Sequence, residues 1–347
     1  MNSIRLFKTL GWSLLLLMVI SAYAAPQKQE APLTRFEYER PEMGVAFRIV
    51  LYATDQSTAD RAADAAFRRI QELNDIMSDY EPDSELSRLS RSSGQGHEVR
   101  VSNDLWFVLQ RSQALAEKSE GAFDVTVGPY VVLWRRARRQ HQLPDPARLA
   151  QARDAVGYRH VRLDPKNQSV ELLVPNMRLD LGGIGKGYAL DQALKVLREQ
   201  GVDRALVEGG GDVEVAEPPP GKPGWRIELS SVDATNAPPA RFLLLKNHAI
   251  STSGDLYQRL EIDGKRYSHI VDPRTGVGLT NHCVVNVIAP DGITSDSMTK
   301  IPSVLGAGKG LELIDATPGV AGRVMVDNGG KIETSETKGF DRYYAPN

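Results

Sequence analysis

The sequence has a single cysteine among its 347 residues, Cys283, so no disulfide bond can form within the chain. Stability must therefore come from packing. Cys283 lies in a run of β-branched residues, where a cysteine acts as a small buried hydrophobic side chain. His282 precedes it and points to the opposite face of the same predicted strand, so the two side chains make a poor metal site.

Neither sign of charge is in excess. The chain has 42 basic and 44 acidic residues and a formal net charge of −2, which excludes a protein that binds nucleic acid through bulk positive charge. Hydrophobic residues make up 41% and charged residues 25%, a globular composition that excludes disorder throughout. The 30 glycines and 20 prolines follow no period, which excludes a collagen-like chain.

Long apolar runs are absent beyond the N-terminus. Basic side chains precede the apolar residues 10–20, and Ala22-Tyr23-Ala24 follows, which is the pattern of a secretory signal peptide. The run is shorter than the roughly 20 residues that span a membrane. We expect cleavage after Ala24 and a soluble, exported, periplasmic protein without a membrane span. The predicted divisions are a signal peptide (1–24), a polar tether (25–34) and one folded domain (35–345).

Apolar side chains at helical spacing predict three helices. The first is capped by Ser57 or Thr58, the second begins near Ser102, and the third runs from Tyr188 to just before Gly201. Alternating patterns predict strands, beginning with residues 47–51. Turn sequences such as Asp263-Gly264, and 327–330 near the C-terminus, predict hairpins. Adjacent hairpins interleaved with helices favour an α+β fold with a mostly antiparallel sheet over a doubly wound parallel sheet.

A glycine-rich segment, residues 180–189, places Asp180, closely spaced glycines and Lys186 directly before the third predicted helix. Free backbone N–H groups, the positive end of a helix dipole and an ammonium group together suit a phosphate. A P-loop is excluded because Gly187 follows Lys186, and Tyr188 stands where a dinucleotide fingerprint needs glycine. The alternative is a tight packing turn.

Other side chains allow two interpretations each. His269 is predicted on a hairpin strand before an Asp-Pro turn, where a lone histidine is structural or catalytic. Asp296 caps a helix or holds a hard cation such as Mg²⁺. Tyr80 covers the core or stacks on a ligand. The arginines of 135–139 form a solvated helical turn, or they bind a nucleotide or the acidic face of a partner. Ser253 lacks the sequence of a serine-hydrolase elbow.

Several of these segments occur together in the order and spacing of one family. The chain resembles the ApbE-type FAD:protein FMN transferases from about Met43 to the C-terminal strands. The resemblance implies a T-fold-like α+β architecture, in which two lobes surround a ligand cleft. The segments that carry it are 122–129, 180–189, 207–212, 252–255, 268–276 and 296–306.

The resemblance also implies an activity. Members of the family bind FAD, and a Mg²⁺-dependent reaction moves its FMN portion onto a Thr or Ser hydroxyl of an acceptor protein and releases AMP. Exported members modify acceptor proteins of electron-transfer systems. FAD would therefore be a substrate, Mg²⁺ the cofactor, and an electron-transfer protein the partner.

The resemblance assigns roles to residues that match the family's motifs. Lys186 would neutralise phosphate charge, and His269 is a candidate base for the target hydroxyl, since its ordinary pKa lies near neutral pH. The residues implied to contact FAD are Met43, Tyr80, Ala122, Phe123, Asp124, Asp180, Lys186 and Ile270. Those implied to hold Mg²⁺ are Gly183, Asp296 and Thr299.

One position departs from the family pattern. Family members commonly carry threonine four residues after the metal-binding aspartate, but here that residue is Lys300, and the hydroxyl stands one residue earlier at Thr299. Pro302 removes a backbone donor within the same predicted helix. Two alternatives stay open beside the transferase. The same site with water in place of the acceptor hydroxyl would make a Mg²⁺-dependent FAD pyrophosphatase that gives FMN and AMP. Lys300 and Pro302 motivate the other alternative, a periplasmic flavin-binding or carrier protein without catalysis.

Overall fold

The computed structural model describes residues 32–229, 231, 240–254 and 259–346. The predicted signal peptide and all but the last three residues of the predicted tether lie outside the described residues. From Leu33 onward the chain forms one compact unit. No helix in the described ranges combines the length and the apolar character needed to cross a membrane.

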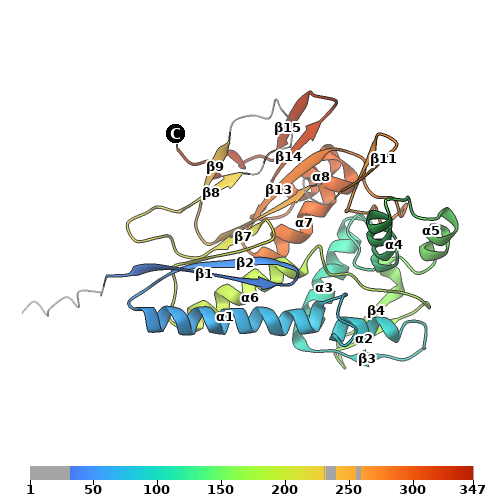
Figure 1. Cartoon of the computed structure of the whole chain (residues 1–347), viewed down its shortest axis with the longest axis horizontal. Helices are drawn as coiled ribbons and strands as arrows, with labels where there is room; N and C mark the ends of the chain where they lie inside the picture. Colours follow the sequence, from blue (N-terminus) through green and yellow to red (C-terminus); the bar gives the residue numbers. More distant parts are fainter. Residues whose placement is uncertain (1–31, 230, 232–239, 255–258, 347) are drawn as a thin grey trace, which may run out of the picture. The chain divides into compact units, whose positions relative to one another are not determined.

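The centre of this unit is an eight-stranded sheet in the order β1-β2-β6-β7-β10-β13-β14-β15 (Figure 1). Every neighbouring pair of strands in it is antiparallel. The α+β fold with a mostly antiparallel sheet is therefore confirmed. The strands are β1 (Thr34–Glu42), β2 (Val45–Ala53), β6 (Ala205–Gly209), β7 (Asp212–Val215), β10 (His248–Gly254), β13 (Cys283–Ala289), β14 (Ala321–Asp327) and β15 (Ile332–Glu336).

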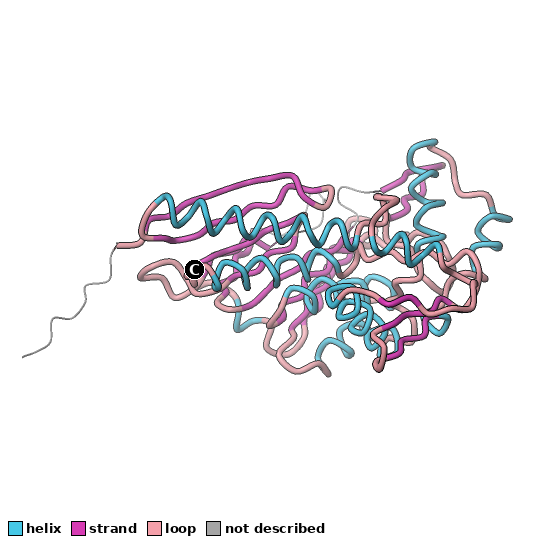
Figure 2. Tube along the Cα trace, turned by 90° about the horizontal axis from the view of Figure 1, so that it is seen from below, coloured by secondary structure: helices cyan, strands magenta, loops and turns pink. Residues whose placement is uncertain are grey.

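Helices cover one face of the sheet, and Figure 2 shows them lying over the strands. They are α1 (Gln56–Met77), α6 (Gly185–Glu199), α7 (Gly292–Leu305) and α8 (Ala307–Asp315). The predicted cap of the first helix was wrong: Asp55 is the N-cap, and its side chain accepts a hydrogen bond from the Thr58 N–H at 2.9 Å. Helix α6 begins at Gly185, three residues before the predicted start, and is followed by Gly201 at φ 81°.

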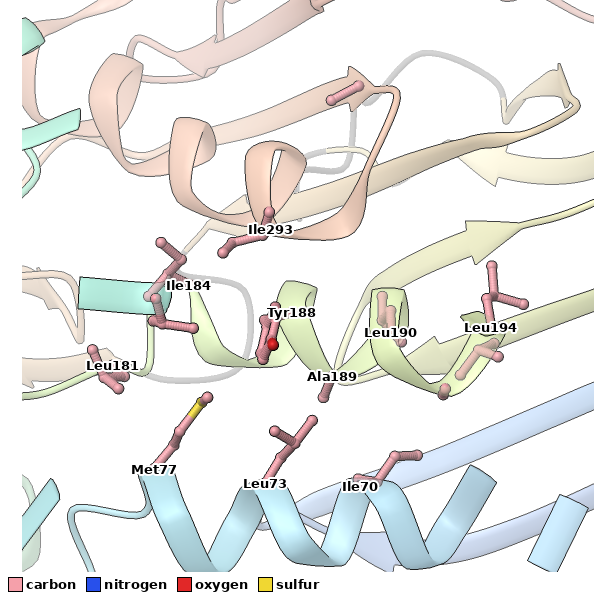
Figure 3. Close-up of a cluster of buried hydrophobic side chains, with 14 of the residues drawn as sticks. Ile70, Leu73, Met77, Leu181, Ile184, Tyr188, Ala189, Leu190, Leu194 and Ile293 are labelled. Atoms are coloured by element: carbon pink, nitrogen blue, oxygen red, sulfur yellow. The ribbon is translucent and has the colours of Figure 1, made fainter. Parts of the chain in front are cut away.

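The larger core lies between these helices and the sheet. On α1, Ile70, Leu73 and Met77 recur at three- and four-residue spacing and point toward α6, which presents Tyr188 and Ala189 (Figure 3). Burial of each large apolar side chain contributes about 1.5–3 kcal/mol relative to exposure. The apolar stripes of the sequence therefore fix the position of α6, and with it the glycine segment at its start.

A second core lies on the other face of the sheet, under the hairpin of β8 (Trp225–Leu229) and β9 (Arg241–Leu245) and the 3₁₀ turn η2 (Asp341–Tyr343). Strand β13 contributes to both cores, because Val287 packs among the helices and Ile288 packs on this opposite side. Its continuous apolar run follows from burial on both faces. Cys283 at its start is buried, as predicted.

The remaining elements lie beside the helices (Figure 1), and α2, α3 and β5 contribute side chains to the larger core. Strands β3 and β4 flank β5 in a three-stranded sheet, and β11 and β12 form a hairpin whose turn residues Asp263 and Gly264 both have positive φ, as its sequence predicts. The elements are α2 (Glu85–Arg91), β3 (Val99–Arg100), α3 (Asn103–Lys118), α4 (Gly128–Gln140), α5 (Pro146–Arg153), η1 (Tyr158–His160), β4 (Val161–Asp164), β5 (Ser169–Leu172), β11 (Arg259–Ile262) and β12 (Lys265–Ser268).

Candidate active site

Two glycines let the first turns of α6 and α7 touch. A Cβ atom placed on Gly187 would lie 2.1 Å from the Gly292 carbonyl oxygen, and one on Gly292 would lie 2.4 Å from the Gly187 carbonyl oxygen. Only glycine fits at either position. The close approach brings Lys186 of α6 next to Asp296 of α7, and the Gly187 N–H donates to Asp296 Oδ2 at 3.1 Å.

Four charged side chains meet at this contact: Lys186, Asp212, Asp296 and Lys300, here called the charged cluster. Lys186 Nζ lies 2.6 Å from Asp212 Oδ2 and 3.6 Å from Asp296 Oδ2. Lys300 Nζ lies 3.1 Å from Asp296 Oδ1. Both carboxylates are buried, and Asp296 is fully so. The two ammonium groups balance the two carboxylates, so the cluster is neutral as a whole.

Burial and neighbouring charges set the protonation of the cluster. Burial opposes ionisation of Asp296, but Lys186 and Lys300 outweigh it and hold the pKa of Asp296 below its usual value. Burial also opposes the charge on Lys186, yet Asp212 and Asp296 raise the pKa of Lys186. Burial raises the pKa of Asp212, an effect that Lys186 opposes and Asp296 reinforces. The Lys186 ammonium therefore stays charged beside the glycine segment, where it can meet an anionic ligand.

The predicted metal ligands surround Lys300. The Thr299 hydroxyl donates to the Asp296 carbonyl at 2.7 Å and accepts from Lys300 Nζ at 2.8 Å. A Cβ atom on Gly183 would lie 3.2 Å from Lys300 Cε. Asp296 is a residue of the second turn of α7, since Asp291 is the N-cap, so the interpretation of Asp296 as a helix cap was wrong. Its carboxylate is left for the charged cluster.

Arg135 links Asp180 to Tyr80. The guanidinium of Arg135 pairs with Asp79, contacts Asp180 Oδ2 at 3.0 Å and lies over the Tyr80 ring, 4.1 Å from its centroid. Of the interpretations of the arginine run, a solvated turn does not hold for Arg135, whose side chain is largely buried on α4. Tyr80 does not cover the core, because it is 72% exposed. Its exposed ring stacks on Arg135, which in turn contacts Asp180.

Asp180 shapes the start of the glycine segment. Its Oδ1 accepts from the Gly182 N–H at 2.8 Å. Burial and the neighbouring Asp79 raise the pKa of Asp180, and Arg135 opposes this effect. Asp180 is therefore held by the protein's own donors, and Arg135 is the charged group that ties it to helix α4.

Of the other residues predicted to contact FAD, some lie beside the glycine segment and one anchors a nearby loop. Phe123 and Met43 flank the glycine segment, because Phe123 Cε2 lies 3.6 Å from the Cβ position of Gly183 and the Met43 methyl lies 4.0 Å from that of Gly185. Ala122 is buried beside Phe123. Asp124 accepts hydrogen bonds from Thr126 and from the Tyr158 N–H, so its carboxylate ties its own loop to η1.

His269 and Ile270 belong to a separate hairpin. His269 directly follows β12, so its predicted place on the strand was wrong by one residue. The Ile270 N–H donates to Ser268 Oγ at 3.1 Å. The chain beyond them packs on α4, where Trp134 Nε1 donates to the Gly276 carbonyl at 2.8 Å. Helix α4 thus contacts both the His269 hairpin and, through Arg135, the glycine segment.

Two residues of this arrangement, Asp212 and Arg135, were not predicted from the sequence. Asp212 ends the segment 207–212 that contributed to the resemblance, but it received no role, and Arg135 was grouped with exposed arginines. The triple glycine before Asp212 was an available signal, because it permits a tight turn, and Gly210 and Gly211 both have positive φ. Nothing in the local pattern around Arg135 distinguishes it from its neighbours.

A second pair of carboxyl groups, Asp191 of α6 and Glu214 of β7, lies at the start of α7. Asp191 Oδ1 accepts from the Gly292 N–H at 2.6 Å and Oδ2 from the Ile293 N–H at 3.0 Å. Burial raises the pKa of Asp191 to about 6. Burial and Asp191 raise the pKa of Glu214 well above its usual value. Glu214 therefore stays protonated and shares a hydrogen bond with Asp191. Its buried Oε2 has no hydrogen-bond partner among the described residues.

This carboxyl pair should make stability fall as pH rises. The folded state holds these protons more tightly than the unfolded chain, so their stabilising contribution is complete at low pH and is lost as pH rises through the folded pKa values. Glu214→Gln keeps a donor to Asp191 but has no ionisable proton. It should therefore flatten the loss of stability as pH rises from the ordinary carboxyl pKa through about 6, the raised pKa of Asp191, and beyond. Urea unfolding across that range measures it, with the exposed Glu312→Gln as control. A Glu214→Gln profile parallel to the wild type would contradict the assignment.

The chain is similar to known proteins over most of its length. A model of the ApbE family matches residues 43–324. The FAD:protein FMN transferase of Klebsiella pneumoniae strain 342 is 32% identical over 276 residues, which cover 79% of this chain and 84% of that protein. The solved flavin transferase ApbE from Vibrio cholerae has a TM-score of 0.80 at 29% identity and covers 90% of this chain and 100% of its own.

A second solved structure agrees. The apo form of the flavinyl transferase ApbE from Pseudomonas stutzeri has a TM-score of 0.79 at 26% identity, covering 91% of this chain and 98% of that chain. The residues matched by the family model include the whole charged cluster and the hairpin that carries His269.

Proposed function

The chain belongs to the ApbE family, and on that basis we propose that it transfers FMN from FAD to a Thr or Ser hydroxyl of an acceptor protein and releases AMP. The observation that carries this proposal is the charged cluster at the start of α6. A buried cluster that keeps Lys186 charged beside a glycine-bounded helix start is suited to hold the diphosphate that joins the two halves of FAD.

The proposed reaction is a displacement at phosphorus. The acceptor hydroxyl oxygen forms a new bond to the phosphorus of the FMN half, and the anhydride bond to the AMP phosphate breaks. The electron pair of that bond leaves with AMP, and the hydroxyl proton passes to His269. Positioning and charge neutralisation supply most of the rate in such transfers. Lys186 would stabilise the charge, and Tyr80, Met43 and Phe123 would hold the rings of FAD.

The other residues that were predicted to contact FAD also have roles in this proposal. Asp180 and Arg135 would fix the glycine segment against helix α4, and Ile270 would lie beside the nucleotide next to His269. Ala122 and Asp124 would hold the loop that carries Phe123, because Asp124 already anchors that loop to η1.

The proposed reaction requires Mg²⁺, so the site should offer oxygen donors that suit this ion. In the described ranges no three histidine, cysteine, aspartate or glutamate side chains gather at a metal-binding distance. The Asp296 carboxylate and the Gly183 carbonyl are hard oxygen donors that suit Mg²⁺, with FAD phosphate oxygens or water completing the set. Thr299 would have to give up the hydrogen bonds it now makes. Bound there, Mg²⁺ would offset negative charge on the departing AMP.

We place the reaction in the periplasm, with an electron-transfer protein as acceptor. The support is the signal-peptide pattern of residues 1–24 and the family resemblance.

His269→Ala should lower the rate of FMN transfer by about 10²- to 10⁴-fold, because a positioned general base contributes on that order. The full chain is incubated with FAD, Mg²⁺ and a candidate acceptor, and the FMN adduct on the acceptor is followed by mass spectrometry. His97→Ala, an exposed histidine before β3, is the matched control. Transfer by His269→Ala at the wild-type rate would remove the proposed base.

The same assay separates the alternatives. Free FMN and AMP without an adduct would favour the pyrophosphatase. Unchanged FAD with every acceptor tried would favour a flavin carrier.

A further inference from the structure

The Lys300 ammonium lies beside oxygen atoms of residues that are proposed to hold Mg²⁺. Its ammonium is 3.1 Å from Asp296 Oδ1, 2.8 Å from Thr299 Oγ1 and 3.4 Å from the Asp296 carbonyl oxygen. Its stem runs against Gly183, whose Cβ position is 3.2 Å from Lys300 Cε. All three residues proposed to hold Mg²⁺ are therefore neighbours of this one side chain.

The net charge of the cluster also indicates that Lys300 takes the place of a metal cation. Lys186 and Lys300 together match Asp212 and Asp296, so without Lys300 the cluster would carry one excess negative charge. Asp296 is fully buried, and charge interactions at buried sites are weakly screened. A divalent ion that approaches Asp296 must compete with the Lys300 ammonium for Oδ1 and is repelled by it.

The side chain also has room to act on a ligand. Lys300 is on α7 with 18% of its side chain exposed, whereas Asp296 is completely covered. A lysine is a point charge on a flexible stem and binds phosphate without a fixed geometry. Its ammonium can therefore leave Asp296 for a diphosphate held at the start of α6 while its stem stays beside Gly183.

We propose that Lys300 is a tethered cation that performs part of the work of the divalent ion: it pairs with Asp296 in the free protein and with the FAD diphosphate in the complex, and it weakens Mg²⁺ binding. This inference rests on the proposed function, since it assumes that the diphosphate binds beside the charged cluster. It predicts a flavin transferase with a reduced requirement for divalent cations.

Calorimetric titration tests the inference by binding rather than turnover. Mg²⁺ is titrated into the full chain, alone and with FAD, for the wild type, Lys300→Thr and the exposed control Lys309→Thr of α8. Lys300→Thr should bind Mg²⁺ about tenfold or more tightly than the wild type, since it removes the repelling charge and adds an oxygen. Lys309→Thr should match the wild type. Thermal melting shows whether Lys300→Thr is folded. If Lys300→Thr does not fold, Lys300→Met takes its place in the titration. Lys300→Met removes the charge without adding an oxygen, and it should also bind Mg²⁺ more tightly than the wild type.

Transfer assays with and without EDTA add a second arm. The wild type should keep a larger fraction of its rate in EDTA than Lys300→Thr. Equal Mg²⁺ affinities for the wild type and a folded Lys300 variant would overturn the inference. The two proposals fail separately: absence of FMN adducts in every protein counts against the transferase, whereas the titration decides the role of Lys300 without any transfer.

Discussion

Asp296→Asn should reduce FMN transfer by about 10²-fold or more, because it removes the carboxylate that positions both ammonium groups of the charged cluster. In the wild type, Lys186 and Lys300 approach opposite oxygens of Asp296, and the Gly187 N–H donates to one of them. The amide keeps one acceptor oxygen and nearly the same shape, but it has no charge. Transfer rates measured by mass spectrometry at saturating FAD report the loss.

The same substitution should lower the free energy of unfolding. Removing one member of a buried ion pair costs about 3–5 kcal/mol, and the partial exposure of both lysines reduces that figure here. Adding Lys300→Met to Asp296→Asn should restore part of the stability, because it removes an unpaired ammonium, without restoring transfer. Urea unfolding measures both variants, with the exposed Asp315→Asn of α8 as control. Wild-type transfer by Asp296→Asn would show that the cluster is structural only.

Gly187→Ala should destabilise the protein although alanine is the better helix former. In an exposed helix, the change from glycine to alanine stabilises by about 1 kcal/mol. Here the new methyl group would lie 2.1 Å from the Gly292 carbonyl oxygen and 2.8 Å from Asp296 Cβ, so α6 and α7 must separate. Overpacking of this kind costs typically about 1–3 kcal/mol. The separation also moves Lys186 away from Asp296, so transfer should fall together with stability.

Gly308→Ala is the matched control for that experiment. Gly308 lies in the first turn of α8, and a Cβ atom there would meet nothing within 4 Å. Its unfolding free energy, measured by urea denaturation, should stay unchanged or rise by up to about 1 kcal/mol. If Gly187→Ala proved as stable as Gly308→Ala, the close packing of α6 on α7 would not be what positions the charged cluster.

Much of the local structure follows from the spacing of residue types along the chain. Apolar spacing gave α1 and α3, Ser102 is the N-cap of α3, and Asp263-Gly264 forms the turn of its hairpin. These features depend on residues close together in the chain, and backbone geometry and side-chain periodicity decide them there. The same locality explains the errors: Asp55 caps α1 from just outside the predicted start, and His269 lies one residue past its strand.

Which charged side chains meet depends on how the elements pack in the folded domain. Lys186 of α6 pairs with Asp212 of β7. Asp296 of α7 joins them because Gly187 and Gly292 let α6 and α7 pack in direct contact. From the sequence, Lys186 was a candidate to bind phosphate and Asp296 a candidate to bind a cation, in two separate segments. No role was predicted for Asp212, and Arg135 could not be distinguished from the exposed arginines beside it. Charge pairing depends on the order of the strands and on the depth of burial, and neither is encoded in the spacing of residues along one segment. Packing, which sums contacts over the whole domain, is what turned these side chains into a single site.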